Sequence, residues 1–117
     1  MNIDQFIYGH TQWRQRLQAF INGTGEALDS AKVQQDSLCA LGKWLNGEGL
    51  GFRKEQAYWQ VKAKHTTFHK LAAAVIRRAE DGDKAGARQL IGFRSEFIEA
   101  SDSLVESLQE LKRKVER

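Results

Sequence analysis

Three histidines and one cysteine are the residues of this sequence whose types and spacing indicate metal chemistry. His65 and His69 are separated by one helical turn if this stretch is helical, so both imidazoles can reach one metal ion. His10 and Cys39 are the remaining histidine and the single cysteine. Imidazole and thiolate are ligands that zinc prefers, and four of them complete a tetrahedral site.

The same histidine spacing occurs in the His-Glu-x-x-His motif of zinc proteases, where the glutamate is the general base. In the stretch His65-Thr66-Thr67-Phe68-His69 the second position is Thr66. Because the base is missing, the sequence does not predict a hydrolytic site.

Length and composition favour one domain over residues 1–117. The chain has 41% hydrophobic and 28% charged residues, which is typical of a folded soluble protein. No apolar run approaches the ~20 residues that span a bilayer, and Met1–Asp4 lacks the features of a signal peptide. We therefore expect a cytoplasmic protein without membrane insertion.

The charge pattern argues against nucleic acid as a partner. The net charge is +3, from 18 basic and 15 acidic residues, and the basic runs Arg77-Arg78 and Lys112-Arg113-Lys114 are short. A single cysteine excludes an internal disulfide and leaves a reduced, reactive or metal-bound thiol.

Proline is absent, so nothing interrupts long helices, and we predict an all-α fold. Apolar residues recur at helical period in four segments, which predicts an antiparallel four-helix bundle with a long C-terminal helix and an interior metal site. The predicted helices are approximately Asp4–Asn22, Ser30–Leu45, Arg53–Glu80 and Lys84 to the C-terminus.

The connections between these helices carry turn signals. Asp4 is expected to cap the first helix, and the glycine-dense stretch Asn46–Gly51 to form a turn or a short irregular helix. Asp81–Asp83 is expected to end the third helix, with Gly82 taking the turn and Asp83 capping the next helix.

The four candidate ligands fall on or beside inward helix faces. His10 lies in the apolar stripe of the first helix, Cys39 flanks the stripe Leu38, Leu41 and Leu45 of the second, and His65 and His69 lie on that of the third. A buried imidazole nitrogen without a partner costs roughly 1–3 kcal/mol. Each histidine alone is better explained as a core residue with a hydrogen-bond partner, but the four residues together favour a metal site.

The last helix has a near-heptad seam that Arg94 and Ser101 interrupt. Two interpretations stay open. The seam either packs in the bundle and continues as a dimer surface, or it is a core helix that frays at its end.

Three short motifs occur in order along the chain: His10-Thr11-Gln12-Trp13, Cys39-Ala40-Leu41-Gly42-Lys43-Trp44, and His65-x-x-x-His69. This combination resembles the chemoreceptor zinc-binding domain of bacterial chemotaxis receptors and diguanylate cyclases, over nearly the whole chain. The resemblance implies a four-helix bundle, commonly dimeric, with one zinc ion bound by His10, Cys39, His65 and His69.

Other residues of these motifs have expected roles. Gly42 would remove a side chain where the helices approach the metal, and the indoles of Trp13 and Trp44 would wall the site against water or simply pack in the core. Asp36 either accepts the free N–H of a ligating histidine or faces solvent.

The resemblance implies a regulatory role, because in the family the domain is attached to a methyl-accepting coiled coil or to a cyclic-di-GMP synthase. This sequence has neither a Gly-Gly-Asp/Glu-Glu-Phe motif nor a receptor hairpin. It is either an excised domain or a stand-alone protein that acts on a separate receptor or diguanylate cyclase. Met1 and the charged tail to Arg117 favour the second.

We therefore predict a zinc-binding sensory domain and not an enzyme, because four protein ligands leave no open position for water. Oxidation of Cys39 would weaken its ligation, and some family members are described as sensing oxidants such as hypochlorous acid in this way.

The alternative is a non-sensing helical dimerisation or adaptor protein with a purely structural zinc. Haem attachment through two cysteines is impossible with one cysteine, and the inward faces lack the glutamates of a di-iron site.

Overall fold

The computed structural model describes residues 3–116, and this part of the chain contains helices and no strand. The elements are α1 Ile3–Thr11, α2 Trp13–Ile21, α3 Ser30–Val33, α4 Ala40–Leu45, the 3-10 helix η1 Glu48–Phe52, α5 Gln56–Glu80, α6 Lys84–Leu90 and α7 Glu96–Val115. The all-α prediction is confirmed.

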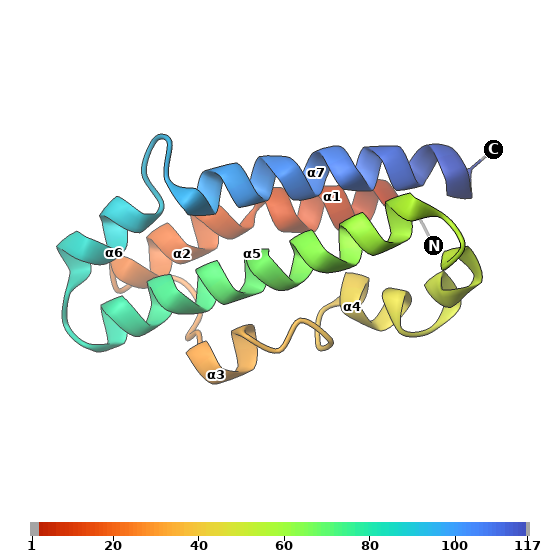
Figure 1. The fold of residues 1–117 in the computed structure, drawn as a ribbon. Helices are drawn as coiled ribbons and strands as arrows, with labels where there is room; N and C mark the ends of the chain where they lie inside the picture. The colour runs from red at the N-terminus through yellow and green to blue at the C-terminus, as the bar shows by residue number, and fades with distance from the viewer. Residues whose placement is uncertain (1–2, 117) are drawn as a thin grey trace.

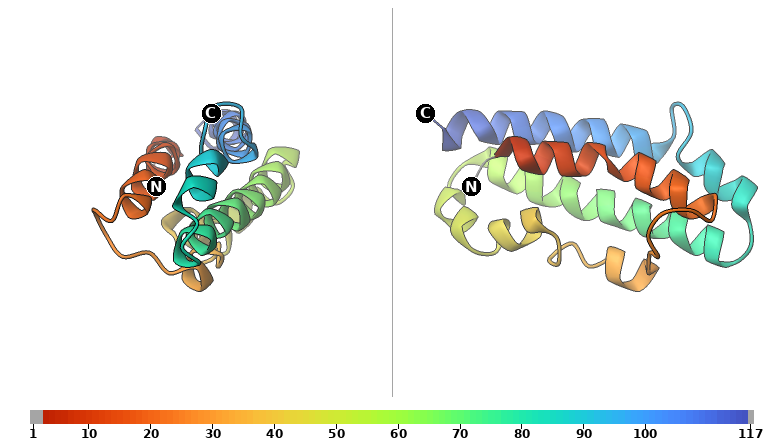
Figure 2. Two further views of the ribbon diagram at one scale, coloured as in Figure 1. Left: turned by 90° about the vertical axis from the view of Figure 1, so that its left-hand side faces the viewer. Right: turned by 180° about the vertical axis from the view of Figure 1, so that it is seen from behind.

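Three long rods lie side by side along a molecule of 46 × 25 × 19 Å (Figures 1 and 2). They are the α1–α2 pair, α5 and α7. The short helices α3 and α4 lie along the far side of α5 from α7. Apolar side chains from all three rods fill the space between them, so the core runs the length of the molecule. None of the helices in residues 3–116 combines the length and hydropathy that crossing a membrane requires.

The first predicted helix is confirmed with one interruption. Gln12 separates α1 from α2 but keeps helical backbone angles, and its N–H still donates to the Tyr8 carbonyl at 3.2 Å. Asp4 does not cap this helix, because α1 begins at Ile3. The Asp4 carboxylate instead accepts from the Lys112 ammonium of α7 at 2.9 Å.

The prediction of a second continuous helix over Ser30–Leu45 is wrong. Only α3 and α4 form, and the stretch between them is extended or turned. In a continuous helix the Val33 carbonyl would accept from the N–H four residues on. Here it accepts from the Nδ1 of His69 on α5 at 2.8 Å, so a tertiary hydrogen bond replaces the helical one. Leu38, expected in the inward stripe, is 51% exposed.

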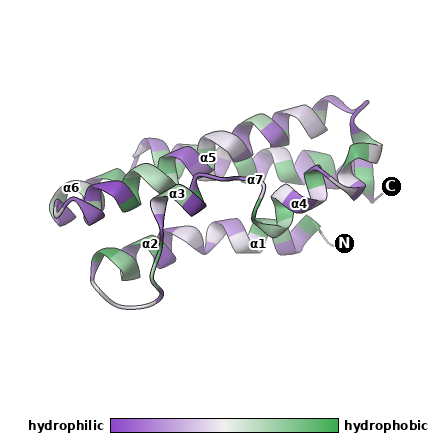
Figure 3. Cartoon of the chain, turned by 90° about the horizontal axis from the view of Figure 1, so that it is seen from below, coloured by the Kyte–Doolittle hydropathy of each residue, from purple (hydrophilic) through white to green (hydrophobic). Residues whose placement is uncertain are grey.

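Viewed from the side of α3 and α4, the stretch between these two helices crosses in front of the long helices and is largely hydrophilic (Figure 3).

The third predicted helix is confirmed as α5, which begins at Gln56 rather than Arg53. The irregular helix expected within Asn46–Gly51 is confirmed as η1.

The last predicted helix is also broken, into α6 and α7. Asp83 caps α6 as expected, accepting from the Gly86 N–H at 2.8 Å, and Gly82 takes the turn with φ 89°. The unpredicted break follows Leu90. Ser95 starts α7 by accepting from the Ile98 N–H at 3.3 Å, and Arg94 before it has φ 63°.

The seam of α7 is buried within this one chain. Leu104, Leu108 and Leu111 are each 0% exposed and lie in the core with residues of α1 and α5. Both interpretations that the sequence left open place these three residues in the bundle core, and their burial agrees with each. They are not available as a dimer surface.

Candidate metal centre

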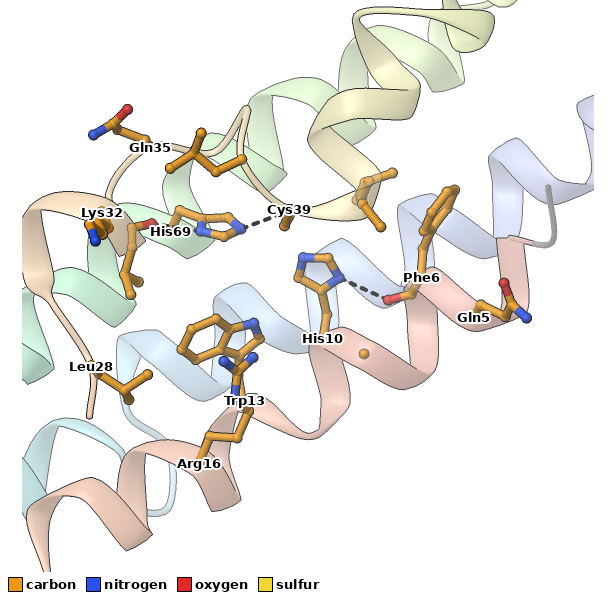
Figure 4. A pocket seen from close by; sticks show the side chains of 15 residues that line it. Gln5, Phe6, His10, Trp13, Arg16, Leu28, Lys32, Gln35, Cys39 and His69 are labelled. Atoms are coloured by element: carbon orange, nitrogen blue, oxygen red, sulfur yellow. Dashed lines mark hydrogen bonds between the residues drawn. The ribbon is translucent and has the colours of Figure 1, made fainter. Parts of the chain in front are cut away.

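The structure brings together all four residues that the sequence singled out. One ligand atom from each of His10, Cys39, His65 and His69 lies within 4.8 Å of the other three. The Cys39 Sγ is 3.2 Å from the Nε2 of His65 and 3.6 Å from the Nε2 of His69. Figure 4 shows the side chains of His10, Cys39 and His69 converging from three different segments.

These separations suit a tetrahedral ion. Zinc binds nitrogen at about 2.0–2.1 Å and sulfur at about 2.3 Å, which places neighbouring ligand atoms roughly 3.3–3.7 Å apart. The two sulfur–nitrogen distances already lie close to these values, and no separation within the cluster exceeds 4.8 Å.

Backbone carbonyls fix the tautomers of two histidines. His10 Nδ1 lies 2.8 Å from the Phe6 carbonyl, and His69 Nδ1 lies 2.8 Å from the Val33 carbonyl. A carbonyl oxygen only accepts, so each Nδ1 carries the proton and donates. In the neutral ring Nε2 then presents a lone pair, and this is the nitrogen that faces the cluster.

Burial keeps the imidazoles neutral. His10, His65 and His69 are at most 5% exposed. Burial lowers the pKa of His10 to about 4 and that of His65 to about 2, with the neighbouring histidines adding to the effect. Burial also lowers the pKa of His69. Neutral imidazole is the form that binds a metal.

The Nε2 of His10 is the atom that points most directly to a metal-binding role. It is buried and has no hydrogen-bond partner among the described residues. An unsatisfied buried nitrogen costs roughly 1–3 kcal/mol. A metal ion that accepted its lone pair would remove this cost, so the residues present fit the ion that the sequence implies.

Cys39 reaches the cluster from an unexpected position. It does not lie within a helix but is the N-cap of α4, with extended backbone angles, and its Sγ accepts from the Gly42 N–H at 3.4 Å. Burial raises the pKa of this thiol. A bound cation together with the N–H of Gly42 would favour the thiolate.

Gly42 is required, but for a different reason from the one predicted. A Cβ at this position would lie 1.9 Å from the carbonyl oxygen of Asp36. The close approach is therefore between α4 and the turn before Cys39, and not between two helices at the metal.

Asp36 and Thr66 form a contact that sequence reasoning missed. The Thr66 hydroxyl donates to the Asp36 carboxylate and so ties the turn before Cys39 to α5. His10 and His69 donate to carbonyls instead, so they do not use Asp36 as an N–H acceptor. Only the position of Thr66 beside His65 could have suggested that it faces this turn.

The two tryptophans differ in role. The Trp13 ring centroid lies 6.2 Å from that of His69, which places it beside the cluster as predicted. Trp44 packs against Phe6 at 5.8 Å and Phe52 at 6.0 Å, so its contacts are those of a core residue.

One side of the cluster opens to a pocket. A cavity of about 340 Å³ is lined by residues that include His10, Trp13, Cys39 and His69 (Figure 4). Cys39 is partly exposed and is one of the residues that line this pocket.

The fold and the cluster define a helical domain with an interior site for a metal bound by three nitrogens and one sulfur. Residues 10–76 match the family model described as "Chemoreceptor zinc-binding domain". The match covers more than half of the chain and includes all four residues of the cluster. The chain belongs to this family. Searches of curated proteins and of solved structures gave no match.

Replacing Gly42 with alanine is expected to disturb the site more than the fold. Gly42→Ala pushes the Asp36–Cys39 turn away from α4, which should lower stability by about 1–3 kcal/mol and weaken zinc binding at least about tenfold. Thermal melts and titration against a zinc chelator measure both effects. Gly51→Ala is the control, because a Cβ there meets no atom within 4 Å. Equal zinc affinity in the two variants would contradict this account of Gly42.

Proposed function

We propose that this protein is a zinc-binding regulatory domain of bacterial signal transduction, in which one zinc ion is held by His10, Cys39, His65 and His69. The observation that carries the proposal is the convergence of the four ligand atoms within 4.8 Å, together with the buried His10 Nε2, which has no hydrogen-bond partner within residues 3–116. Membership of the family supports the signalling role.

The site supports binding rather than catalysis. When bound, zinc would supply a cationic centre that draws four ligands together and holds Cys39 as a thiolate. Four protein ligands leave no open position for an activated water, so we propose that the protein is not an enzyme.

The four residues come from three separate segments of the chain. His10 belongs to α1, Cys39 caps α4, and His65 and His69 lie on α5. The binding free energy of a metal at such a site becomes stability of the arrangement. The turn before Cys39 is the part that would gain freedom on release, because it lies between α3 and α4 and is held by turn hydrogen bonds such as that from the Leu38 N–H to the Gln35 carbonyl at 3.2 Å.

The domain and its partners are part of the same proposal. We propose that residues 1–117 form one domain and a variant of the antiparallel four-helix bundle, in which α3, the turn and α4 take the place of the second helix. The output would pass to a separate receptor or diguanylate cyclase, or to a further segment of the same protein, as in chemotaxis or cyclic-di-GMP signalling.

Two signals are compatible with the site. The ambient zinc level is one, and oxidation of Cys39 is the other, which the 340 Å³ pocket beside the sulfur supports. A purely structural zinc is the competing interpretation, and the near-complete burial of the three histidines favours it. Affinity separates the alternatives, because a site saturated under all cellular conditions cannot report zinc.

Zinc content tests the assignment of the ligands. Protein purified without added metal should contain one zinc per chain by elemental analysis, and His65→Ala should contain none. Thr67→Ala, an exposed position on the same helix, is the matched control and should keep its zinc. Retention of zinc by His65→Ala would contradict the ligand set.

Metal removal should destabilise the fold. Because the binding free energy is coupled to folding, a strong chelator should lower the melting temperature by at least roughly 10 °C. Differential scanning calorimetry with and without chelator measures the shift. An unchanged melting curve in protein shown to have lost its zinc would argue against a stabilising site.

Oxidant-dependent release tests the redox form of the proposal. Hypochlorous acid would oxidise the Cys39 thiolate to sulfenic acid and would itself be reduced to chloride. This oxidation weakens the binding of zinc by the Cys39 sulfur. Zinc release, followed with a colorimetric chelator, should rise with oxidant dose in the natural sequence and much less in a zinc-loaded Cys39→Ser variant. Equal release from the two proteins would exclude Cys39 as the sensor.

A further inference from the structure

The loop between α6 and α7 presents a phenylalanine to solvent. Phe93 is 89% exposed, and in Figure 1 the loop projects beyond the packed helices. The other exposed large hydrophobic residues of the described chain are covered to a greater extent. A single exposed apolar residue carries no conclusion by itself. Three further features of this loop do.

The first feature is backbone strain. Arg94 has φ 63° and is the non-glycine residue with positive φ in the described chain. This region is disfavoured for an arginine, and such outliers concentrate at binding sites and switch regions. The Arg94 guanidinium lies 5.2 Å from the Phe93 ring centroid, so the strained residue and the exposed ring form one unit.

The second feature is a short repeat in the sequence. Leu50–Glu55 and Ile91–Glu96 share the pattern Gly-Phe-Arg-x-Glu, and each directly precedes or begins a long helix. In the first copy Phe52 is half-buried and stacks on Trp44, with ring centroids 6.0 Å apart and an interplanar angle of 23°. In the described chain Phe93 stacks on no aromatic ring. Phe93 of the second copy therefore lacks the aromatic packing partner that Phe52 has in the first.

The third feature is an apolar pocket beside the loop. It has a volume of about 270 Å³ and lies between α5, α6 and α7. A cavity of about 150 Å³ suffices for benzene, so a phenyl group fits. Leu90 and Ser95, which flank the loop, both line this pocket. Its apolar wall consists of Leu71, Ala74, Val75, Leu90 and Phe97.

We propose that Phe93 of one copy of this chain inserts into this pocket of a second copy, and that the contact is reciprocal. A two-fold interface requires a patch that is complementary to itself, and a projecting ring next to a pocket of matching size forms such a patch. The charges agree, because Arg94 lies beside the ring and Glu96 lines the pocket. In the dimer each Arg94 faces the partner's Glu96.

The size of the contact sets its expected strength. Two phenylalanine anchors bury roughly 300–500 Å², below the ~1,200 Å² of a standard stable interface. The dimer is therefore weak and depends on protein concentration. Because anchors in pockets dominate such interfaces, losing one should weaken association by at least about tenfold.

Analytical ultracentrifugation of the zinc-loaded full chain over a wide concentration range tests the proposal. Phe93→Ala removes the anchor, and Ala74→Met fills the pocket from its helix wall. Both should raise the dimer dissociation constant at least about tenfold. Tyr8→Ala is the control, because Tyr8 is also aromatic and is 67% exposed on α1, and it should leave the constant unchanged. Far-UV circular dichroism checks that each variant is folded.

A charge exchange tests the orientation. Arg94→Glu and Glu96→Arg should each weaken the dimer, and the double variant should recover part of the loss. No recovery would contradict the pairing of Arg94 with the partner's Glu96.

Several results would overturn the docking itself. If the natural sequence stays monomeric over the whole concentration range, the contact is excluded. If Phe93→Ala also lowers the melting temperature of that monomer, Phe93 occupies the pocket of its own chain. Unchanged association of Phe93→Ala or of Ala74→Met excludes the anchor or the pocket, and equal weakening by Tyr8→Ala indicates non-specific association. The inference does not depend on the zinc site: Phe93→Ala should keep the zinc content of the natural sequence, whatever that content is.

Discussion

The structure depends on one constraint: three imidazoles in a dry interior must each find partners for two ring nitrogens. Backbone carbonyls of Phe6 and Val33 take the Nδ1 protons of His10 and His69. This leaves Nε2 lone pairs facing the cluster and the Cys39 sulfur, and within residues 3–116 the His10 Nε2 has no hydrogen-bond donor. A metal cation is the group that satisfies several inward-facing lone pairs at once.

The interruption of the second helix follows from this constraint. The Val33 carbonyl orients His69, so it is lost to the helix, and α3 ends there. The chain then doubles back closely enough that only glycine fits at position 42, and it delivers Cys39 at the N-cap of α4. At that position a backbone N–H points at the sulfur, which an internal helical cysteine would not receive. The break in the helix thus both positions the Cys39 sulfur and gives it a backbone hydrogen bond that favours the thiolate.

The four ligands could be predicted from the sequence, whereas the interruptions of the second and last predicted helices could not. The i, i+4 spacing of His65 and His69 on a 25-residue helix is local information, and so is the place of His10 in an apolar stripe. The break after Val33 depends on a hydrogen bond to a residue 36 positions away, which periodicity does not contain. The break before Ser95 had a weak signal, because Gly92 and a good N-cap serine lie together. The recurrence of apolar residues across the break, from Leu90 to Phe97 and Leu104, concealed it.

Zinc K-edge X-ray absorption spectroscopy of the purified protein tests the central claim most directly, because it reports the ligand atoms themselves. The account predicts one sulfur at about 2.3 Å and three imidazole nitrogens at about 2.0–2.1 Å, with no oxygen in the coordination sphere. A spectrum without sulfur, or with a water or carboxylate oxygen in place of one nitrogen, would contradict the assignment of His10, Cys39, His65 and His69 as a closed site.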